Sequence, residues 1–156
     1  MDFKVGQIFA TDEEKLSVAI AEAHLGLAEG GIPIGAALFD ENGALLGSGH
    51  NLRVQEGDAS MHGETSAFRN AGRQRSYRKV TLATSLSPCW YCSGLIRQFG
   101  IGRVLVGDDK NFMGGQDWVA EHGCELKVMN DPGLIKLMGD FIENNDALWN
   151  EDIGEE

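Results

Sequence analysis

The sequence lacks features that would assign it to other classes of protein. No apolar run approaches the roughly 20 residues that a membrane-spanning helix needs. Residues 1–10 have neither the basic start nor the apolar stretch of a signal peptide. Only three cysteines are present, an odd number that does not suit the disulfide framework of a small secreted protein. We therefore expect a cytoplasmic protein without a membrane anchor.

Basic residues are also scarce. Lys and Arg number 13 against 24 Asp and Glu, which gives a formal net charge of −11. A protein that binds DNA or RNA normally needs Lys and Arg to neutralise phosphates, and the overall field here would repel a polynucleotide. Positions 69–79 carry five positive residues, which could form a local basic patch. The charge balance still favours a small neutral substrate and no nucleic-acid partner.

The residues that are present suffice for one folded domain. The 156 residues, 42% of them hydrophobic, can bury a core without disulfides, and no linker or repeat divides residues 1–156. Apolar spacing alternates between helical and strand patterns, which predicts a three-layer α/β/α sandwich around a five-stranded mixed sheet. The expected strands are 34–39, 45–52, 80–86, 103–107 and 125–129, and the expected helices are 12–29, 62–72, 88–99, 116–122 and 132–144.

Short polar residues mark where several helices should begin. Thr11 starts a capping box for the first helix. Ser87 followed by Pro88 predicts the start of helix 88–99, and Asp131 does the same for helix 132–144. A loop is expected around Gly57, and the short segment 147–153 follows the last helix.

Two short segments carry the residues that indicate chemistry: His62-Gly63-Glu64 and Pro88-Cys89-Trp90-Tyr91-Cys92. One His and two Cys suit a tetrahedral zinc site whose fourth position stays open, as a catalytic zinc requires. Both segments lie at the start of predicted helices, where the helix dipole favours thiolate over thiol. We therefore predict one Zn²⁺ per chain, held by His62, Cys89 and Cys92.

Glu64 lies two residues beyond His62, in the first turn of the same predicted helix. In that position its carboxylate would be close to a metal-activated water without being a ligand. A carboxylate so placed can take a proton from the water and pass it to a ring nitrogen and then to leaving ammonia. We predict that Glu64 is the catalytic proton shuttle.

A Cys-x-x-Cys pair alone is a weak signal, because it also occurs in redox pairs and in helix cores. The preceding Pro88 and the upstream His-x-Glu narrow the interpretation, since His-x-Glu followed by Pro-Cys-x-x-Cys is the signature of zinc deaminases. A zinc-stabilised interaction domain without turnover is the alternative from another class. Such sites usually have four protein ligands, and Cys124 is the further cysteine that could supply the fourth.

Nearly the whole chain resembles the cytidine deaminase superfamily, and within it the fungal-type cytosine deaminases. The matching segments, of which the C-terminal one is the most specific, are EGGIPIG at 29–35, GHN at 49–51, HGE at 62–64, TSLSPC at 84–89, NF at 111–112, Trp149, and EDIGE at 151–155. The resemblance implies the cytidine deaminase-like fold, a homodimer, and hydrolytic deamination of a free base, cytosine to uracil, in pyrimidine salvage.

The same resemblance implies a role for each residue of the pocket. Asn51 and the backbone N–H of Gly63 would hold the ring edge, while the Ser87 carbonyl and Asp152 would receive the exocyclic amine. Segment 146–156 would act as a cap over the active site. Phe112, Trp149 and Ile153 would close over the base and stack on it, and Leu86 and Ile34 would pack the floor of the pocket.

These roles have structural alternatives. Asn51 could satisfy backbone groups at a strand end, the aromatic residues could be ordinary core, and Asp152 could belong to a solvated acidic tail. Trp90 and Tyr91 are bulky aromatics that differ from the fungal pattern and could reshape the pocket or a dimer contact. Isocytosine, guanine, a creatinine-like ring and the adenosine of a tRNA therefore stay open as substrates. We interpret His24, His50 and His122 as structural and Cys124 as a buried thiol.

Overall fold

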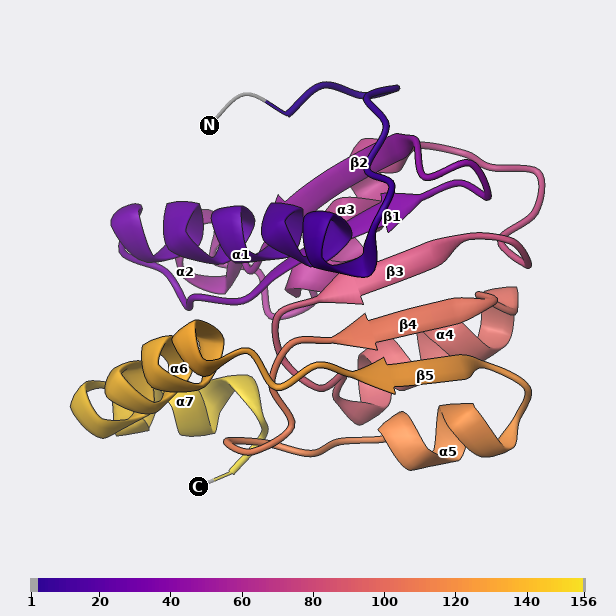
Figure 1. The fold of residues 1–156 in the computed structure, drawn as a ribbon. Helices are drawn as coiled ribbons and strands as arrows, with labels where there is room; N and C mark the ends of the chain where they lie inside the picture. The colour runs from indigo at the N-terminus through magenta and orange to yellow at the C-terminus, as the bar shows by residue number, and fades with distance from the viewer. Residues whose placement is uncertain (1–2, 156) are drawn as a thin grey trace.

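The computed structural model describes residues 3–155 and contains the elements labelled in Figure 1. The strands are β1 (Gly35–Phe39), β2 (Leu45–His50), β3 (Thr81–Thr84), β4 (Arg103–Val106) and β5 (Glu125–Val128). The helices are α1 (Asp12–Ala28), α2 (Arg53–Glu56), α3 (Gly63–Ala71), α4 (Trp90–Phe99), α5 (Gln116–Glu121), α6 (Pro132–Asn144) and α7 (Asp146–Asp152). Within the described range, no helix combines the length and apolar character needed to cross a membrane.

The strands form one mixed sheet in the order β2-β1-β3-β4-β5. β1 runs antiparallel to both β2 and β3, whereas β3, β4 and β5 are parallel to one another. α4 connects β3 to β4 and α5 connects β4 to β5, because parallel neighbours need a crossover segment. The predicted five-stranded mixed sheet is confirmed.

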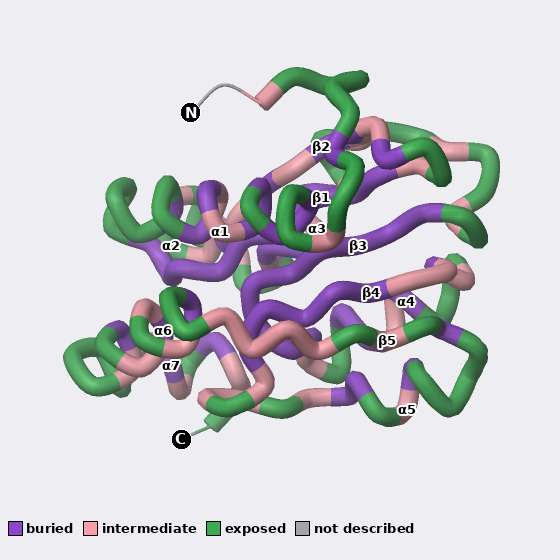
Figure 2. Tube along the Cα trace, viewed as in Figure 1, coloured by how far each residue is buried: buried purple, intermediate pink, exposed green. Residues whose placement is uncertain are grey.

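Helices cover both faces of this sheet, and Figure 2 shows the central strands β1, β3 and most of β4 as the buried layer, whereas the edge strand β5 is intermediate to exposed. Successive side chains of a strand point to opposite faces. In β1, Ala36 and Leu38 therefore pack in one core, and Ala37 and Phe39 pack in the other. The first core includes Ala67 of α3, Ile96 of α4 and Val119 of α5, and the second includes Leu16 of α1 and Leu134 of α6. The three-layer prediction is confirmed.

The sheet topology gathers several predicted site residues at one edge. Because β1 is antiparallel to β2 and β3, its first residue lies beside the last residues of both, with Gly35 opposite His50 and Ala36 opposite Thr84. Ile34, Asn51 and the segment 85–87 therefore meet there. The N–H of Gly35 donates to Ser85 Oγ at 2.9 Å and closes this edge.

The prediction that Ser87 and Pro88 begin the fourth helix is wrong. α4 begins at Trp90 and its N-cap is Cys89, whose Sγ accepts a hydrogen bond from the Cys92 N–H at 3.5 Å. Ser87 is engaged elsewhere, because its N–H donates to the Asp108 carbonyl at 2.8 Å and its Oγ accepts from the Gly114 N–H at 3.3 Å. Because α4 begins later than expected, both cysteines lie at its start.

The other two helix starts are confirmed, and two helices are new. Thr11 Oγ1 accepts from Glu14 N–H at 3.1 Å, and Asp131 Oδ2 accepts from Leu134 N–H at 2.9 Å. The one-turn helix α2 lies in a segment that was expected to be a loop, and α7 lies in the C-terminal segment to which no helix was assigned.

His50, the last residue of β2, bridges two carboxylates of the α1 region. Its Nδ1 lies 2.8 Å from Glu22 Oε1 and its Nε2 lies 2.7 Å from Glu29 Oε1. The hydrogen bond with Glu22 is the largest cause that raises the pKa of His50 above its ordinary 6.5, and burial opposes it. The charged ring thus ties α1 to the strand that ends just before Asn51.

We expect His50→Gln to lower the free energy of unfolding in a pH-dependent way. Because folding raises the pKa of His50, its charge contributes fully below pH 6.5 and the contribution disappears as pH rises through the folded value. Urea unfolding of zinc-loaded protein should show a loss of about 1.5 to 3 kcal/mol at pH 6, the worth of hydrogen bonds to a charged group, and a smaller loss at alkaline pH.

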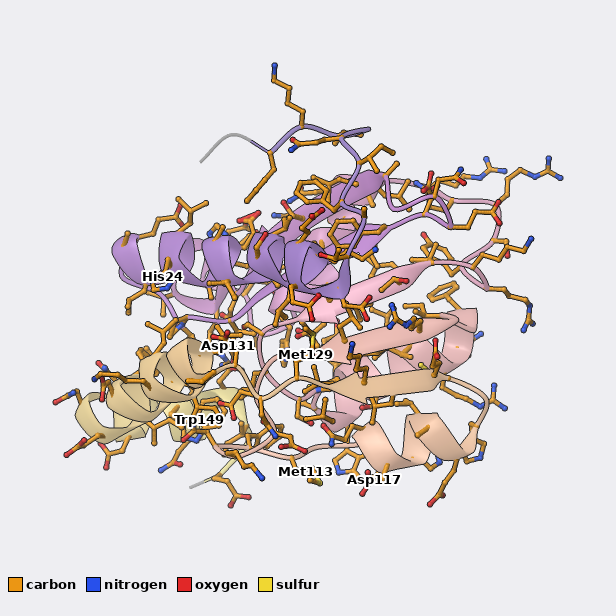
Figure 3. The ribbon with its side chains drawn as sticks, viewed as in Figure 1. His24, Met113, Asp117, Met129, Asp131 and Trp149 are labelled. Atoms are coloured by element: carbon orange, nitrogen blue, oxygen red, sulfur yellow. The ribbon has the colours of Figure 1, made fainter. Side chains whose placement is uncertain are left out.

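The control for this measurement is His24→Gln, which changes an exposed histidine of α1 (Figure 3). It should leave the free energy of unfolding unchanged at both pH values. A loss in His50→Gln that is the same at both pH values would contradict the charged bridge.

Candidate metal centre and active site

The three predicted metal ligands come together where the N-termini of α3 and α4 meet. His62 is the N-cap of α3, Cys89 is the N-cap of α4, and Cys92 lies in the first turn of α4. Their ligand atoms all lie within 4.8 Å of one another, and Cys89 Sγ is 3.5 Å from His62 Nδ1. Bonds of about 2.3 Å to sulfur and 2.1 Å to nitrogen put such ligands roughly 3.6 Å apart on a tetrahedron. The donor set therefore fits zinc.

The three side chains hold protons that a metal ion would displace on binding. The hydrogen bond from Cys92 lowers the pKa of Cys89 to about 4, against the effect of burial. The same bond raises the pKa of the Cys92 thiol well above its usual range, so the two sulfurs share one proton that a metal ion would displace. Burial is the largest single effect and lowers the pKa of His62, but the hydrogen bond to Cys89 and the negative charges of Glu64, Cys89 and Asp152 together outweigh it and raise that pKa to about 9.

The fourth coordination position has no protein ligand in the described part of the chain. His62, Cys89 and Cys92 are the group of potential ligands found among residues 3–155. Cys124, the remaining cysteine, is buried in the core that contains Ile96 and Val119, which agrees with its interpretation as a buried thiol. This arrangement disfavours a structural zinc site closed by four ligands.

Glu64 lies beside the ligand group in the first turn of α3 and is only 4% exposed. Burial is the largest cause that raises its pKa, and the negative charge of Cys89 adds to it, so that the pKa reaches about 7. A carboxyl group with a pKa near the working pH can both accept and donate a proton. Glu64 therefore has the properties that a proton shuttle needs.

One cavity of about 330 Å³ unites the candidate site. All nine predicted substrate-binding residues line it, together with His62, Glu64 and Cys89: they are Ile34, Asn51, Gly63, Leu86, Ser87, Phe112, Trp149, Asp152 and Ile153. Cys92 lies behind this wall and is fully buried.

The polar part of the wall contains an amide in a fixed orientation. Asn51 is fully buried, and its Oδ1 accepts from the Arg53 N–H at 2.9 Å while its Nδ2 lies 3.3 Å from both oxygens of Asp152. Asp152 is buried as well, so it is not part of a solvated acidic tail. At Gly63 a Cβ would lie 3.1 Å from the Ile34 carbonyl, so glycine lets α3 approach β1 closely.

The apolar part of the wall comes from α7 and the residue after it, from the loop after β4, and from Ile34 and Leu86 beside the central strands. Phe112 and Trp149 meet edge to face, with ring centroids 5.7 Å apart. Trp149 lies on α7 (Figure 3) and packs in a cluster with Ile34, Leu86 and Ile153. The aromatic residues are part of the core, which was the alternative to a role in binding. The same core also forms the wall of the cavity.

Trp90 and Tyr91 lie outside the inner cavity. Both line a second, outer groove together with Arg53 and Met113, and Trp90 is 65% exposed. The two aromatics are therefore not part of the lining of the inner cavity. Tyr91 nevertheless contacts the metal group, because its ring meets His62 edge to face at 5.0 Å and its hydroxyl donates to the Ser60 carbonyl at 3.2 Å.

Arg53 is the residue near the site that the sequence analysis missed. Its Nε donates to Asp152 Oδ1 at 2.7 Å. The one local signal was its position two residues after Asn51, whereas its partner lies 99 residues away in the chain.

Comparison with known proteins agrees with this geometry. A cytosine deaminase from Candida albicans is 43% identical over 92% of this chain and 97% of its own length. A tRNA-specific adenosine deaminase from Haemophilus influenzae is 35% identical over 62% of this chain and 57% of its own length. The structure of a guanine deaminase from Nitrosomonas europaea superposes with a TM-score of 0.74, at 18% identity over 87% of each chain.

The family assignment rests on the segment that contains the site. Residues 9–108, which include His62, Glu64 and both site cysteines, match the cytidine and deoxycytidylate deaminase zinc-binding region. The resemblance to cytidine deaminases and the expected fold are both confirmed. The chain therefore belongs to the cytidine and deoxycytidylate deaminase family of zinc-binding proteins, and it is a deaminase that hydrolyses a C–N bond.

Proposed function

We propose that this chain hydrolyses free cytosine to uracil and ammonia, as a step of pyrimidine salvage. The observation that carries the proposal is a small cavity bounded by the His62–Cys89 pair, the buried carboxyl group of Glu64 and helix α7. Similarity to a cytosine deaminase over 92% of the chain supports cytosine as the base. In this reaction water adds to C4 of the ring, the bond to the exocyclic nitrogen breaks, and that nitrogen leaves as ammonia.

The zinc is part of the proposal, with one ion per chain held by His62, Cys89 and Cys92. When bound there, zinc would supply Lewis acidity that activates water at neutral pH. Glu64 would move the protons: it would accept one from the attacking water, give it to ring N3, and assist the exocyclic nitrogen as it leaves. Its raised pKa of about 7 supports this role.

Recognition of the base is assigned to the polar wall. The carboxamide of Asn51 and the N–H of Gly63 would pair with the ring N–H and carbonyl, since a carboxamide offers a donor and an acceptor side by side. The Ser87 carbonyl and the Asp152 carboxylate would accept from the exocyclic amine. Phe112, with the rest of the apolar wall, would stack on the ring and exclude water.

The proposed substrate is a free base because segment 146–156 would act as a cap. This segment contains α7, and its residues Trp149 and Ile153 are part of the cavity wall. Its last residue, 156, lies outside the described range. A ribose attached to the ring would need the space that this wall occupies. The net charge of −11 opposes a tRNA substrate, which would need phosphate contacts.

We also propose that two copies of the chain associate. Four large apolar side chains on α4 and the loop after β4 are exposed: Trp90, Tyr91, Phe99 and Met113. Burial of such side chains is a common driving force for association. Sedimentation velocity should give the mass of a homodimer, and a monomer at micromolar concentration would contradict this part of the proposal.

The substrate is tested by ammonia release from a panel of compounds with the zinc-loaded protein. Cytosine, isocytosine, guanine, adenine, creatinine and an adenosine-containing tRNA anticodon stem represent the open possibilities. We expect cytosine to have the highest kcat/KM, with uracil as the product. A higher value for guanine, creatinine or the tRNA stem would replace cytosine, and no ammonia from any compound would support the interaction domain.

Trp149→Ala should weaken base binding while leaving the zinc in place. The change removes the ring that packs against Phe112 and opens the cavity to water, whereas the metal ligands lie on other helices. We expect KM for cytosine to rise by about tenfold, from lost stacking of roughly 1 kcal/mol and a less closed cap. Removal of residues 149–156 should have a larger effect of the same kind.

The control is Trp118→Ala, which removes an indole ring from α5 that is not part of the cavity wall. Steady-state kinetics and zinc analysis of the three variants give the comparison. Unchanged kinetics after the truncation would contradict the cap.

A further inference from the structure

Arg53, the first residue of the short helix α2, is bonded to two consecutive residues of α7. Its Nε donates to Asp152 Oδ1 at 2.7 Å and its Nη1 donates to Glu151 Oε2 at 3.2 Å. Arg53 also follows Asn51 closely and donates its backbone N–H to the Asn51 side chain at 2.9 Å. One residue thus connects the polar wall of the cavity with the helix that covers it.

These bonds are the main polar attachment of α7. Among the residues that the structure describes, the side chains of α7 form hydrogen bonds with the body of the domain only through Arg53 and Asn51. The Asn51 bonds are longer, at 3.3 Å. The rest of the attachment is the apolar packing around Trp149. The position of α7 therefore depends strongly on Arg53.

Burial makes the Asp152 bond the important one of the two. The side chain of Asp152 is 4% exposed and that of Arg53 is 15% exposed, whereas that of Glu151 is 60% exposed. An exposed ion pair contributes little, but a buried carboxylate that loses its cation is left uncompensated. Without Arg53, the buried carboxylate of Asp152 would have to regain contact with water, which would displace it from the wall.

Arg53 acts from outside the cavity. Asp152, Phe112 and Ile153 line both the inner cavity and the outer groove, so they form the partition between the two. Arg53 lines the groove and not the cavity. Arg53 can therefore hold this partition in place without touching a substrate in the inner cavity.

We propose that Arg53 is a positioning residue that keeps Asp152, and with it α7, closed over the cavity. Because only the closed state binds the base well, loss of Arg53 multiplies the apparent affinity by the fraction of molecules that remain closed, which lowers it. Arg53→Gln should therefore raise KM by about tenfold or more and change kcat by less than about threefold. This kinetic part rests on the proposed function, whereas the closure of α7 is a property of the chain alone.

The test is hydrogen–deuterium exchange on the full-length, zinc-loaded protein without substrate. Amides of 146–153 should exchange at least about tenfold faster in Arg53→Gln than in the wild type, while β3 and β4 keep their protection. Arg53→Lys should lie between the two, because an ammonium group lacks the planar fork that reaches both carboxylates. The control is Arg69→Gln, which breaks the exposed pair between Arg69 and Glu56 of the same helix α2 and should leave α7 unchanged.

The outcomes separate this inference from the proposed function. The role of Arg53 would be overturned, whatever the substrate is, if the amides of α7 exchanged at the wild-type rate in Arg53→Gln. It would also be overturned if Arg69→Gln accelerated their exchange equally. Faster exchange with no ammonia from cytosine would support Arg53 and reject the substrate. If Arg53→Gln does not fold, Arg53→Lys provides the test. An exchange rate of α7 and a KM equal to those of the wild type in that variant would overturn the proposal.

Discussion

Glu64→Gln should reduce the turnover of cytosine by about four orders of magnitude and leave the zinc bound. A positioned acid–base group contributes about 10² to 10⁴ for a proton transfer, and Glu64 is assigned more than one transfer. Glutamine fills nearly the same volume in a site where the native side chain is 4% exposed, but its amide cannot take the proton of water. The effect should therefore appear in kcat, with little change in zinc content or in the free energy of unfolding.

The matched control is Glu13→Gln, the same substitution in the first turn of α1 on an exposed residue. It should leave kcat unchanged. Turnover of Glu64→Gln within tenfold of the wild type would reject the proton shuttle. Loss of zinc from a folded Glu64→Gln protein would make Glu64 a ligand instead.

Cys89→Ala should abolish both zinc binding and activity. Zinc sites in small domains bind with apparent free energies of about 10 to 16 kcal/mol, so one lost ligand of three costs on the order of 3 to 5 kcal/mol, or roughly a thousandfold in affinity. Cys89 is also the sulfur with the lowered pKa, about 4, and therefore the thiolate that is ready for a metal. Metal analysis after dialysis and a competition titration with a chromogenic chelator give the two readouts.

Cys124→Ala is the control for this change, because Cys124 is a buried thiol in a core that does not contain the metal group. It should keep stoichiometric zinc. Stoichiometric zinc in Cys89→Ala would contradict the assignment of the ligands.

The chemistry of the centre could be predicted because its residues are close in sequence. Glu64 follows His62 by two residues, and Cys89 and Cys92 share one helical turn, so local helix geometry fixes each pair. The alternation of helical and strand spacing was similarly sufficient for the sheet and its layers. Both signals depend on a few neighbouring residues and need no knowledge of tertiary contacts.

Other features depend on contacts between distant segments. Ser87 was expected to cap a helix, but the carbonyl of Asp108 and the N–H of Gly114 compete for its polar groups. Asp152 had the sequence surroundings of a solvated tail, and its burial depends on pairing with Arg53 and Asn51, which lie 99 and 101 residues away in the chain. The pocket residues were assigned by resemblance, and the antiparallel pairing of β1 explains why Ile34, Asn51 and Ser87 lie at one edge.

The most direct test of the account is the ratio of kcat/KM for cytosine to that for cytidine, measured as ammonia release under identical conditions. To admit a ribose, the cap would have to open and expose Trp149 and Ile153. This exposure costs a free energy of about 1.5 to 3 kcal/mol for each side chain. We therefore expect a preference for cytosine of about a thousandfold. Equal kcat/KM values for cytosine and cytidine would contradict the closed cavity and the proposal that a free base is the substrate.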